Sequence, residues 1–305
     1  MAKILIIVGG GVKHAEPFVE AGVTLGISVK VSSFAKLEYV TGRDETRVTI
    51  DGEDVANYDC IYIRLVGRRY EDVALLVYYA RQKGIKLVDS VYQKDGIIRV
   101  PLPKSLETKI LADAGLPIPR TIFGRMKQIA QKAPNLFGFP FVIKGTMGKQ
   151  GHAVWAPKDD KELQKLVVEF TLKEREGERL IAQEFIKATQ RNRIFVIGGE
   201  AIAGITRPTR WRKRFQNKVN GEYPEAVKAR LDPIPQEDVE IAIAASQALG
   251  IDIGGADIIT DSTTGKKYIL EVNSAPRWAS LKKDTGIDIE AEVIKYLASL
   301  YVILA

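Results

Sequence analysis

Residues 253–276 read IGGADIITDSTTGKKYILEVNSAP, and this segment decides how the rest of the sequence is interpreted. Two apolar runs flank a polar stretch whose serine, threonine and glycine residues favour a turn, so we predict a β-hairpin. If the hairpin is symmetric about Thr264, Asp257 lies directly opposite Glu271. Because side chains alternate along a strand, Asn273 shares a face with Glu271.

Carboxylates that lie opposite each other on neighbouring strands repel, so their charge must be compensated. A hard divalent cation would do this, and the amide oxygen of Asn273 would complete an oxygen ligand set with Asp257 and Glu271. Magnesium binds to a few carboxylates together with substrate phosphates, which matches so sparse a set. The alternative is a solvent-facing strand whose acidic residues bind nothing.

The first hundred residues alternate between strand and helix signals. Short apolar runs at Ile4–Val8, Cys60–Ile63 and Ile85–Val88 indicate buried strands, and Val73–Lys83 indicates a helix. This alternation predicts a mostly parallel α/β sheet. The glycines of Gly9–Gly11 lack the Gly-x-Gly-x-x-Gly spacing of dinucleotide-binding proteins, so they favour a tight strand-to-helix turn over a phosphate cradle.

A second chemical signal is Lys144, which ends an apolar run and precedes the glycine-containing loop Gly145–Gly151. A lysine at a strand end, beside flexible backbone amides, can bind phosphate oxygens. The loop is not a Walker loop, because the Gly-x4-Gly-Lys-Ser/Thr spacing is absent. The alternative is an ordinary hairpin loop.

A third signal is the basic segment at residues 207–214, which holds five positive charges in eight residues, with Trp211 among them. Three interpretations stay open. The segment is a loop that clamps carboxylates or phosphates with planar guanidinium groups, a nucleic-acid patch with one stacking aromatic residue, or a solvated run of charge.

Composition excludes several classes of protein. The 305 residues carry a net charge of +7, which permits an acidic partner without identifying it. One cysteine, Cys60, excludes an internal disulfide framework, and with two histidines it makes no convincing zinc site. The sequence has no Gly-x-Ser-x-Gly elbow for nucleophilic catalysis. Its longest apolar stretch has about half the length of a membrane-spanning helix, so we expect no membrane segment. The single cysteine fits a reducing compartment, so we expect a cytoplasmic protein.

Taken in order, several segments resemble the ATP-grasp ligases, and most closely the RimK-type branch that adds glutamate to protein or cofactor carboxylates. The resemblance covers roughly residues 55–305. Each segment is a weak signal alone, whereas the ordered set is specific. The segments are Pro103–Leu111, Phe141–Gly151, Ala182–Ile186, Gly255–Asp257, Glu271–Pro276 and Asp284–Asp288.

The resemblance implies an ATP-grasp fold of mixed α/β and α+β class. An N-terminal parallel-sheet domain, the pre-ATP-grasp domain, would span residues 1–98. Two α+β lobes would enclose ATP, the small lobe at residues 99–180 and the large lobe, with the metal site, at residues 181–305.

The resemblance also implies ATP and Mg²⁺ as cofactors, with Mn²⁺ as a substitute metal. By matching positions, Lys104 and Lys144 would contact the nucleotide phosphates. Asp257, Glu271 and Asn273 would hold the metal, which is the set already reached from strand geometry. The other implied nucleotide contacts are Gly148 and Gly151 in the glycine loop and the adenine hinge Gln183, Glu184, Phe185 and Ile186, whose last two residues would bind the base through their backbone.

Arginines dominate the positions that match the family's catalytic groups. Arg193 lies where the family keeps an arginine. Arg207 and Asn217 lie where the family binds the substrate or the reacting phosphate, and Arg214 and Arg277 are two further candidates for contact with the acyl phosphate.

The sequence departs from the family pattern at three places. Arg191 stands where the family often has an acidic residue suited to the ribose. Arg214 is one residue further from Asn217 than in the common Arg-x-Asn pattern. Arg277 replaces the glycine that ends the family's Asn-Ala-Ser-Pro-Gly segment, and an arginine there can bind a substrate carboxylate.

The implied activity is an ATP-dependent, ADP-forming carboxylate–amine ligase that works through an acyl phosphate. Its partners would be an amino acid, with glutamate suggested by the resemblance, and an acidic carboxylate acceptor that is a small molecule, a peptide tail or a protein. The alternatives are a phosphotransferase on the same scaffold and, less favoured, a nucleic-acid-binding protein that uses residues 207–214. A homo-oligomer is compatible with the sequence, which does not decide the oligomeric state.

Overall fold

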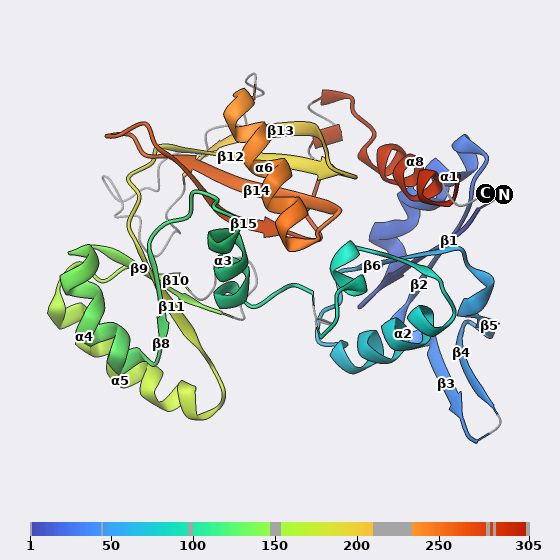
Figure 1. Ribbon diagram of the computed structural model, residues 1–305, viewed down its shortest axis with the longest axis horizontal. Helices are drawn as coiled ribbons and strands as arrows, with labels where there is room; N and C mark the ends of the chain where they lie inside the picture. Colours follow the sequence, from blue (N-terminus) through green and yellow to red (C-terminus); the bar gives the residue numbers. More distant parts are fainter. Residues whose placement is uncertain are drawn as a thin grey trace.

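The computed structural model describes residues 2–43, 45–96, 100–146, 154–209, 234–278, 281–282 and 285–302. A parallel four-stranded sheet and two antiparallel four-stranded sheets form its framework, which confirms the predicted mixture of α/β and α+β architecture. Figure 1 shows three bodies, with the N-terminal sheet on the right, a second sheet and its two helices at the lower left, and the third sheet at the top.

The N-terminal sheet has the order β2–β1–β6–β7 and is parallel throughout, as predicted. Its central strands are almost wholly buried, because packed elements cover both faces of a parallel sheet. A side chain at Gly9 would lie 2.3 Å from the carbonyl oxygen of Val66, so the predicted tight turn after β1 requires glycine. The elements are β1 (Lys3–Val8), α1 (Glu16–Leu25), β2 (Ser28–Ser33), β6 (Cys60–Arg64), α2 (Tyr70–Gln82) and β7 (Lys86–Val88).

A small antiparallel sheet between β2 and β6 was not predicted. It consists of β3 (Leu37–Thr41), β4 (Thr46–Ile50) and the two-residue strand β5 (Glu53–Asp54). These strands are short and mostly polar, so their periodicity is weak. Val48 and Ile50 nevertheless anchor β4 in the same core as the N-terminal sheet.

The second sheet has the order β10–β9–β11–β8, and the helices α4 (Met126–Phe137) and α5 (Asp160–Arg175) pack on it. Its strands are β8 (Thr121–Gly124), β9 (Phe141–Gly145), β10 (Val154–Trp155) and β11 (Leu180–Glu184). The predicted division between residues 180 and 181 falls inside β11, which pairs with both β8 and β9. We therefore propose that the small lobe extends to Glu184.

The third sheet has the order β13–β12–β14–β15 and is antiparallel. It contains the predicted hairpin, in which Asp257 is the register partner of Glu271, so the predicted symmetry about Thr264 is correct at this point. A β-bulge directly after Asp257 shifts the rest of the pairing by one residue. The strands are β12 (Gln190–Ile197), β13 (Glu200–Pro208), β14 (Ile253–Thr260) and β15 (Lys267–Asn273).

Three more helices join the bodies. α3 (Lys104–Asp113) contacts α6 (Gln236–Leu249) and β15 of the third sheet and also β11 of the second. α8 (Ile289–Val302) packs along α1 of the N-terminal domain, as Figure 1 shows. Among the described residues, no helix is both long enough and apolar enough to cross a bilayer. The cytoplasmic location stays a prediction.

The N-terminal domain and the third sheet meet at a buried carboxyl group. Asp89, directly after β7, accepts a hydrogen bond from the backbone N–H of Ile253 at 3.0 Å, and its second oxygen has no partner among the described residues. Next to it, Ser90 donates through its backbone and hydroxyl groups to Asp252 at 2.6 and 2.8 Å. Burial, reinforced by the charge of Asp252, raises the pKa of Asp89 well above its usual range.

We expect Asp89→Asn to raise the free energy of unfolding at pH 7 by about 1 kcal/mol or more, because an amide brings no charge into this buried position. The pKa of Asp89 in the native protein lies above the ordinary 3.8. Once the pH exceeds that ordinary value, the native protein therefore binds more protons than the unfolded chain. The stability of the wild-type protein therefore falls with rising pH, and the advantage of the variant should shrink towards pH 4.

Urea titrations at several pH values measure this difference. The control is Asp113→Asn, which changes an exposed carboxyl of α3 in the same way. An Asp89→Asn protein that is less stable than the wild type at pH 7 would contradict the interpretation.

Candidate active site

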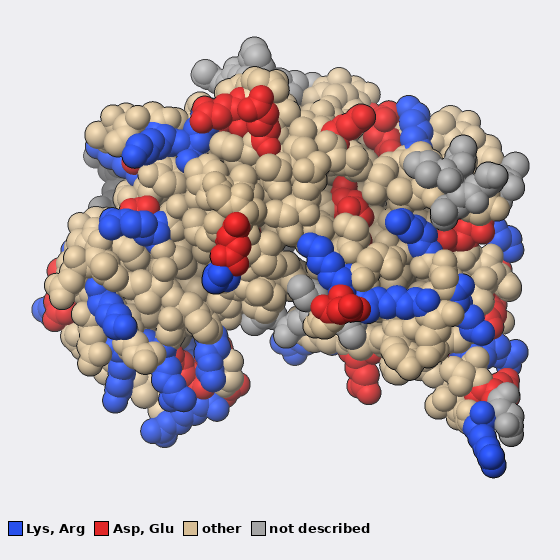
Figure 2. Space-filling model, viewed as in Figure 1, with Lys and Arg blue, Asp and Glu red and all other residues tan. Residues whose placement is uncertain are grey.

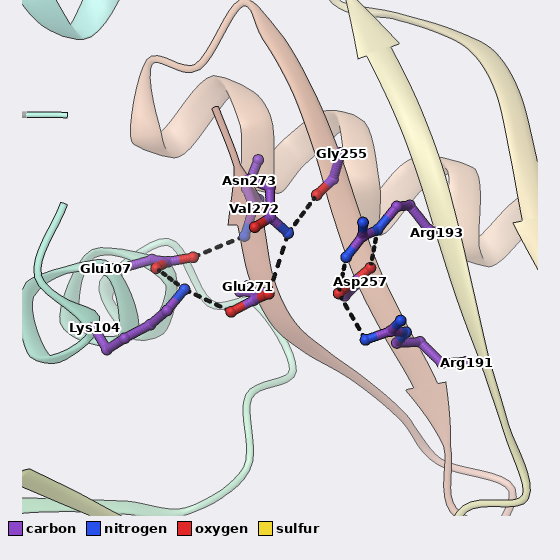
Figure 3. Close-up of polar contacts among 9 residues, drawn as sticks. All are labelled: Lys104, Glu107, Arg191, Arg193, Gly255, Asp257, Glu271, Val272 and Asn273. Carbon is purple, nitrogen blue, oxygen red and sulfur yellow. Dashed lines mark hydrogen bonds and ion pairs between the residues drawn. The ribbon is translucent and has the colours of Figure 1, made fainter. Parts of the chain in front are cut away.

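A row of charged side chains crosses one face of the third sheet where α3 approaches it, as Figure 3 shows. The row exists because antiparallel register partners project to the same face. Arg193 on β12 is the partner of Asp257 on β14, and Asp257 is the partner of Glu271 on β15. Asn273 lies on the same face as Glu271 and donates its amide N–H to it at 3.1 Å, as the two-residue period predicts.

Glu271 is neutralised by Lys104, the first residue of α3. The Lys104 ammonium lies 2.7 Å from Glu271 and 2.9 Å from Glu107, one turn along its own helix. The other oxygen of Glu107 accepts the backbone N–H of Val272 at 2.7 Å. A buried carboxylate therefore fixes the helix to the strand beside the candidate metal ligand.

Asp257 is neutralised by arginine. Arg193 donates to both of its carboxylate oxygens, at 2.6 and 2.7 Å, which is the bidentate geometry that makes arginine–carboxylate pairs strong. Arg191, two residues earlier on the same face of β12, adds a contact of 3.1 Å to one of these oxygens. The opposed carboxylates predicted from the sequence are thus each compensated by cationic side chains of the protein.

Lys144 reaches the same region from the second sheet, at the end of β9. Among the described residues its ammonium has neither a hydrogen bond nor an ion pair. Burial lowers the pKa of Lys144, and the negative charge of Glu271 opposes this shift. A half-buried ammonium near a cluster of charged groups is suited to binding an anion such as a phosphate.

The charges around Glu271 determine its protonation. Burial disfavours the ionised form of Glu271. The charge and hydrogen bond of Lys104, the charge of Lys144 and the hydrogen bond from Asn273 together outweigh burial and hold the pKa of Glu271 at about 2. In Lys104, burial disfavours the ammonium, but the charges of Glu107 and Glu271 raise its pKa above the ordinary value. Both groups are therefore charged at neutral pH.

The donor chemistry of this face fits a hard divalent cation. Asp257 and Glu271 offer carboxylate oxygens, and Asn273 uses its nitrogen towards Glu271, which leaves its amide oxygen without a hydrogen bond among the described residues. No group of three or more His, Cys, Asp or Glu side chains that could hold a metal occurs among those residues, so Asn273 and substrate oxygens would have to complete the shell. The metal roles of these three residues stay a prediction.

The other predicted site residues are distributed as follows. Gln183 and Glu184 end β11, where Gln183 donates to the Thr121 hydroxyl at 2.9 Å and Glu184 forms an ion pair with Arg120 at 2.8 Å. Phe185 and Ile186 follow on the segment that leads to β12. Arg207 lies on β13, and Arg277 is exposed just after β15. Four predicted residues lie outside the described residues, namely Gly148, Gly151, Arg214 and Asn217.

Two participants were missed by sequence reasoning. Glu107 lies three residues after Lys104 on a helix, a spacing that brings side chains together and could have suggested the pair. The contact of Arg191 with Asp257 had a clearer signal, because Arg191 shares a face of the strand with Arg193.

Glu271→Gln should remove a pH-dependent part of the stability. The pKa of Glu271 is about 2 in the native protein against an ordinary 4.5, so the native state favours the charged form. The wild-type protein should be more stable than the variant by about 3 kcal/mol above pH 4.5, and this advantage should be lost as the pH falls towards 2. Glu240→Gln, an exposed change on α6, is the control in urea titrations, and a pH-independent difference between wild type and Glu271→Gln would contradict the assignment.

Comparisons with known proteins agree with this geometry. Residues 103–297 match the RimK-like ATP-grasp domain family. A probable alpha-L-glutamate ligase of Alkalilimnicola ehrlichii is 27% identical over 283 residues, which cover 92% of this chain and 89% of the relative. Among solved structures, the ATP-grasp ligase PsnB, in complex with minimal precursor, Mg and ADP, superposes with a TM-score of 0.72 at 17% identity, covering 97% of this chain and 96% of PsnB.

A RimK domain ATP-grasp protein from Sphaerobacter thermophilus superposes with a TM-score of 0.69 at 18% identity, covering 97% of this chain and 99% of that one. The arrangement of the three sheets is therefore the ATP-grasp fold, and the resemblance of the ordered segments is confirmed. The chain belongs to the family of RimK-like ATP-grasp proteins.

Proposed function

We propose that the protein is an ATP-dependent, ADP-forming carboxylate–amine ligase. The observation that carries the proposal is the charged row, in which Asp257 and Glu271 lie opposite each other with Arg193 and Lys104 on either side and Lys144 close by. Such a site offers oxygen ligands and phosphate-binding cations together. Membership of the RimK-like family, among ligases that use ATP, supports the same chemistry.

The proposed reaction has two steps. An oxygen of the acceptor carboxylate attacks the γ-phosphorus of ATP, the bond to the β-phosphate oxygen breaks, and ADP leaves. The lone pair of the amine then attacks the carbonyl carbon of the acyl phosphate. The carbon–oxygen bond to phosphate breaks, inorganic phosphate leaves, and the amine nitrogen loses a proton as the amide forms.

The residues act mainly by positioning and by neutralising charge. Lys144 and Lys104 would bind phosphate oxygens of ATP, while Arg193 keeps Asp257 in one orientation through its bidentate contact. Asp257, Glu271 and Asn273 would hold Mg²⁺, which offsets the negative charge of the transferred phosphoryl group. Arg207 and Arg277 would stabilise the acyl phosphate, together with Arg214 and Asn217 of the segment outside the described residues.

The proposed substrates are an amino acid such as glutamate and an acidic peptide or protein tail. A relative carries the name probable alpha-L-glutamate ligase, and the PsnB complex contains a precursor. The net charge of +7 is compatible with an acidic partner. Figure 2 shows lysine and arginine side chains on the lobe at the lower left, where α4 and α5 lie. The sequences of these two helices contain Lys127, Lys132, Lys161 and Lys165.

The test is ADP formation from ATP and Mg²⁺ with acidic acceptors, each with and without L-glutamate as the amine. We expect ADP release that requires the acceptor, rises with the amine and yields an amide product. Glu271→Gln should reduce this rate at least a hundredfold, because it removes a charged metal ligand and the partner of Lys104, while Glu240→Gln should keep the wild-type rate.

Two results would contradict the proposal. ADP release with a stable phosphorylated acceptor and no use of the amine would indicate a phosphotransferase. A protein that fails to bind ATP in the presence of Mg²⁺ would exclude both activities. Thermal unfolding of each variant shows that a lost rate reflects the site and not the fold.

A further inference from the structure

The loop that leaves β15 is held by the N-terminal domain through one arginine. Arg64, the last residue of β6, is 6% exposed. Its guanidinium donates to the backbone carbonyl of Pro276 at 2.8 Å and to the Tyr62 hydroxyl at 3.2 Å. Among the described residues, the bond from Arg64 is the one hydrogen bond that the backbone of residues 275–277 makes. The path of this loop therefore depends on a side chain 212 positions away in the sequence.

The same guanidinium also contacts Trp278. Its central carbon lies 4.1 Å from the centroid of the Trp278 ring, which is a cation–π contact. Trp278 is 5% exposed, packs edge-on against Phe18 of α1 and donates its indole N–H to Glu290 of α8 at 2.8 Å. Arg64 thus holds the residue on each side of Arg277, one through its carbonyl group and the other through its ring.

Arg277 depends on these anchors for its position. Its side chain is exposed, and among the described residues it has neither a hydrogen bond nor an ion pair. The two neighbours of Arg277 are buried and fixed by Arg64. Because no contact of its own holds the side chain, the backbone between these neighbours decides where it begins.

The anchored loop borders the charged row. A side chain at Gly255 would lie 2.9 Å from Cβ of Pro276 and 3.6 Å from Cδ of Arg193, so Pro276 packs on β14 beside Arg193. Gly255 is the register partner of Asn273, and register partners project to the same face of the sheet. Pro276 therefore also lies beside Asn273, a candidate metal ligand.

Stability alone does not explain an arginine at position 64. Among the described residues, its partners are a carbonyl group, a hydroxyl group and two aromatic rings, all of them neutral. A buried charge without an ion pair is costly, and an apolar side chain of similar volume would avoid this cost. Arginine can donate to a carbonyl and stack on an aromatic ring at the same time, which is what holding this loop requires.

We propose that Arg64 is a positioning residue, which fixes Arg277 at the edge of the candidate active site through the two neighbours of Arg277. The inference rests on the proposed ligase function, in which Arg277 stabilises the acyl phosphate. Arg64 is buried and acts through the loop. A misplacement of about 1 Å in such a group can cost about a hundredfold in rate, so the anchoring contacts determine how well Arg277 binds the phosphoryl group.

Inorganic phosphate is the probe, because it carries the oxyanion that Arg277 would bind and needs no acceptor. Calorimetry measures its Kd in the full chain saturated with Mg²⁺ and ADP. Arg277→Met should raise this Kd about tenfold or more, because a charge-assisted contact is lost. Arg64→Met should raise it about fivefold or more by misplacing the same group. The Kd of ADP should change less than twofold in both variants.

A double-mutant cycle decides whether Arg64 acts through Arg277. In the Arg277→Met background, Arg64→Met should change the Kd of phosphate less than twofold, because the group that it positions is already absent. Arg64→Lys keeps the charge without the planar fork, so it should raise the Kd about threefold. This variant also serves if thermal unfolding shows that Arg64→Met does not fold. Arg47→Met, an exposed change on β4, is the control and should alter neither Kd.

Several results would overturn the proposal. An equal effect of Arg64→Met with and without the Arg277 side chain would indicate a general change of packing or charge. A loss in Arg64→Met together with wild-type affinity in Arg64→Lys would reduce the role of Arg64 to its charge. Unchanged phosphate affinity in Arg64→Met, or absent phosphate binding by the wild-type protein, would also contradict the proposal.

Failure of the ligase function has a different signature. It would appear as absent binding of ADP with Mg²⁺ or as the absence of amine-dependent ADP release. The results that overturn the role of Arg64 leave both of these intact, so the two failures can be distinguished.

Discussion

The site depends on one constraint, which is that two carboxylates lie opposite each other on adjacent strands. Asp257 and Glu271 are register partners in the hairpin of β14 and β15, and both point to the same face. Their repulsion can be tolerated only where cations approach closely. Lys104 and Arg193 do this through short contacts from opposite sides of the pair. The geometry that makes the pair costly also places two sets of carboxylate oxygens side by side, which is why we propose this pair as ligands of a divalent cation.

Charge compensation also links the parts of the fold. Lys104 begins α3, whose Glu107 is bonded to the backbone of β15, while Lys144 comes from the second sheet. Two lysines that we propose to bind phosphate are thereby brought near carboxylates of the third sheet. At the start of β14, the third sheet is joined to the N-terminal domain by two hydrogen bonds. Asp89 accepts the backbone N–H of Ile253, and Asp252 accepts the backbone N–H of Ser90. The ATP-grasp arrangement brings these groups together from segments far apart in the sequence.

Sequence alone predicted the parts of the site that depend on local periodicity. The opposition of Asp257 and Glu271 follows from a symmetric turn and a two-residue period, and it is confirmed. The cations that neutralise these acids could not be found in this way, because Lys104 and Arg193 are 167 and 64 residues from their partners. The small sheet of residues 37–54 was missed because its strands are short, although Val48 and Ile50 alternate with polar residues along β4. The predicted boundary at residue 180 cuts β11, and we propose to move it to Glu184, because strand pairing is a long-range property that local sequence does not reveal.

In the proposed reaction, an acceptor carboxylate becomes an acyl phosphate before an amine replaces the phosphate. The most direct measurement uses an acceptor whose reacting carboxylate carries ¹⁸O in both oxygens, followed by mass spectrometry of the inorganic phosphate and of the amide. If the acyl phosphate forms, each phosphate released carries one ¹⁸O atom and the amide keeps the other. Phosphate without ¹⁸O, formed at the same rate as ADP, would contradict it, because the phosphoryl group would then have passed to water or to another acceptor.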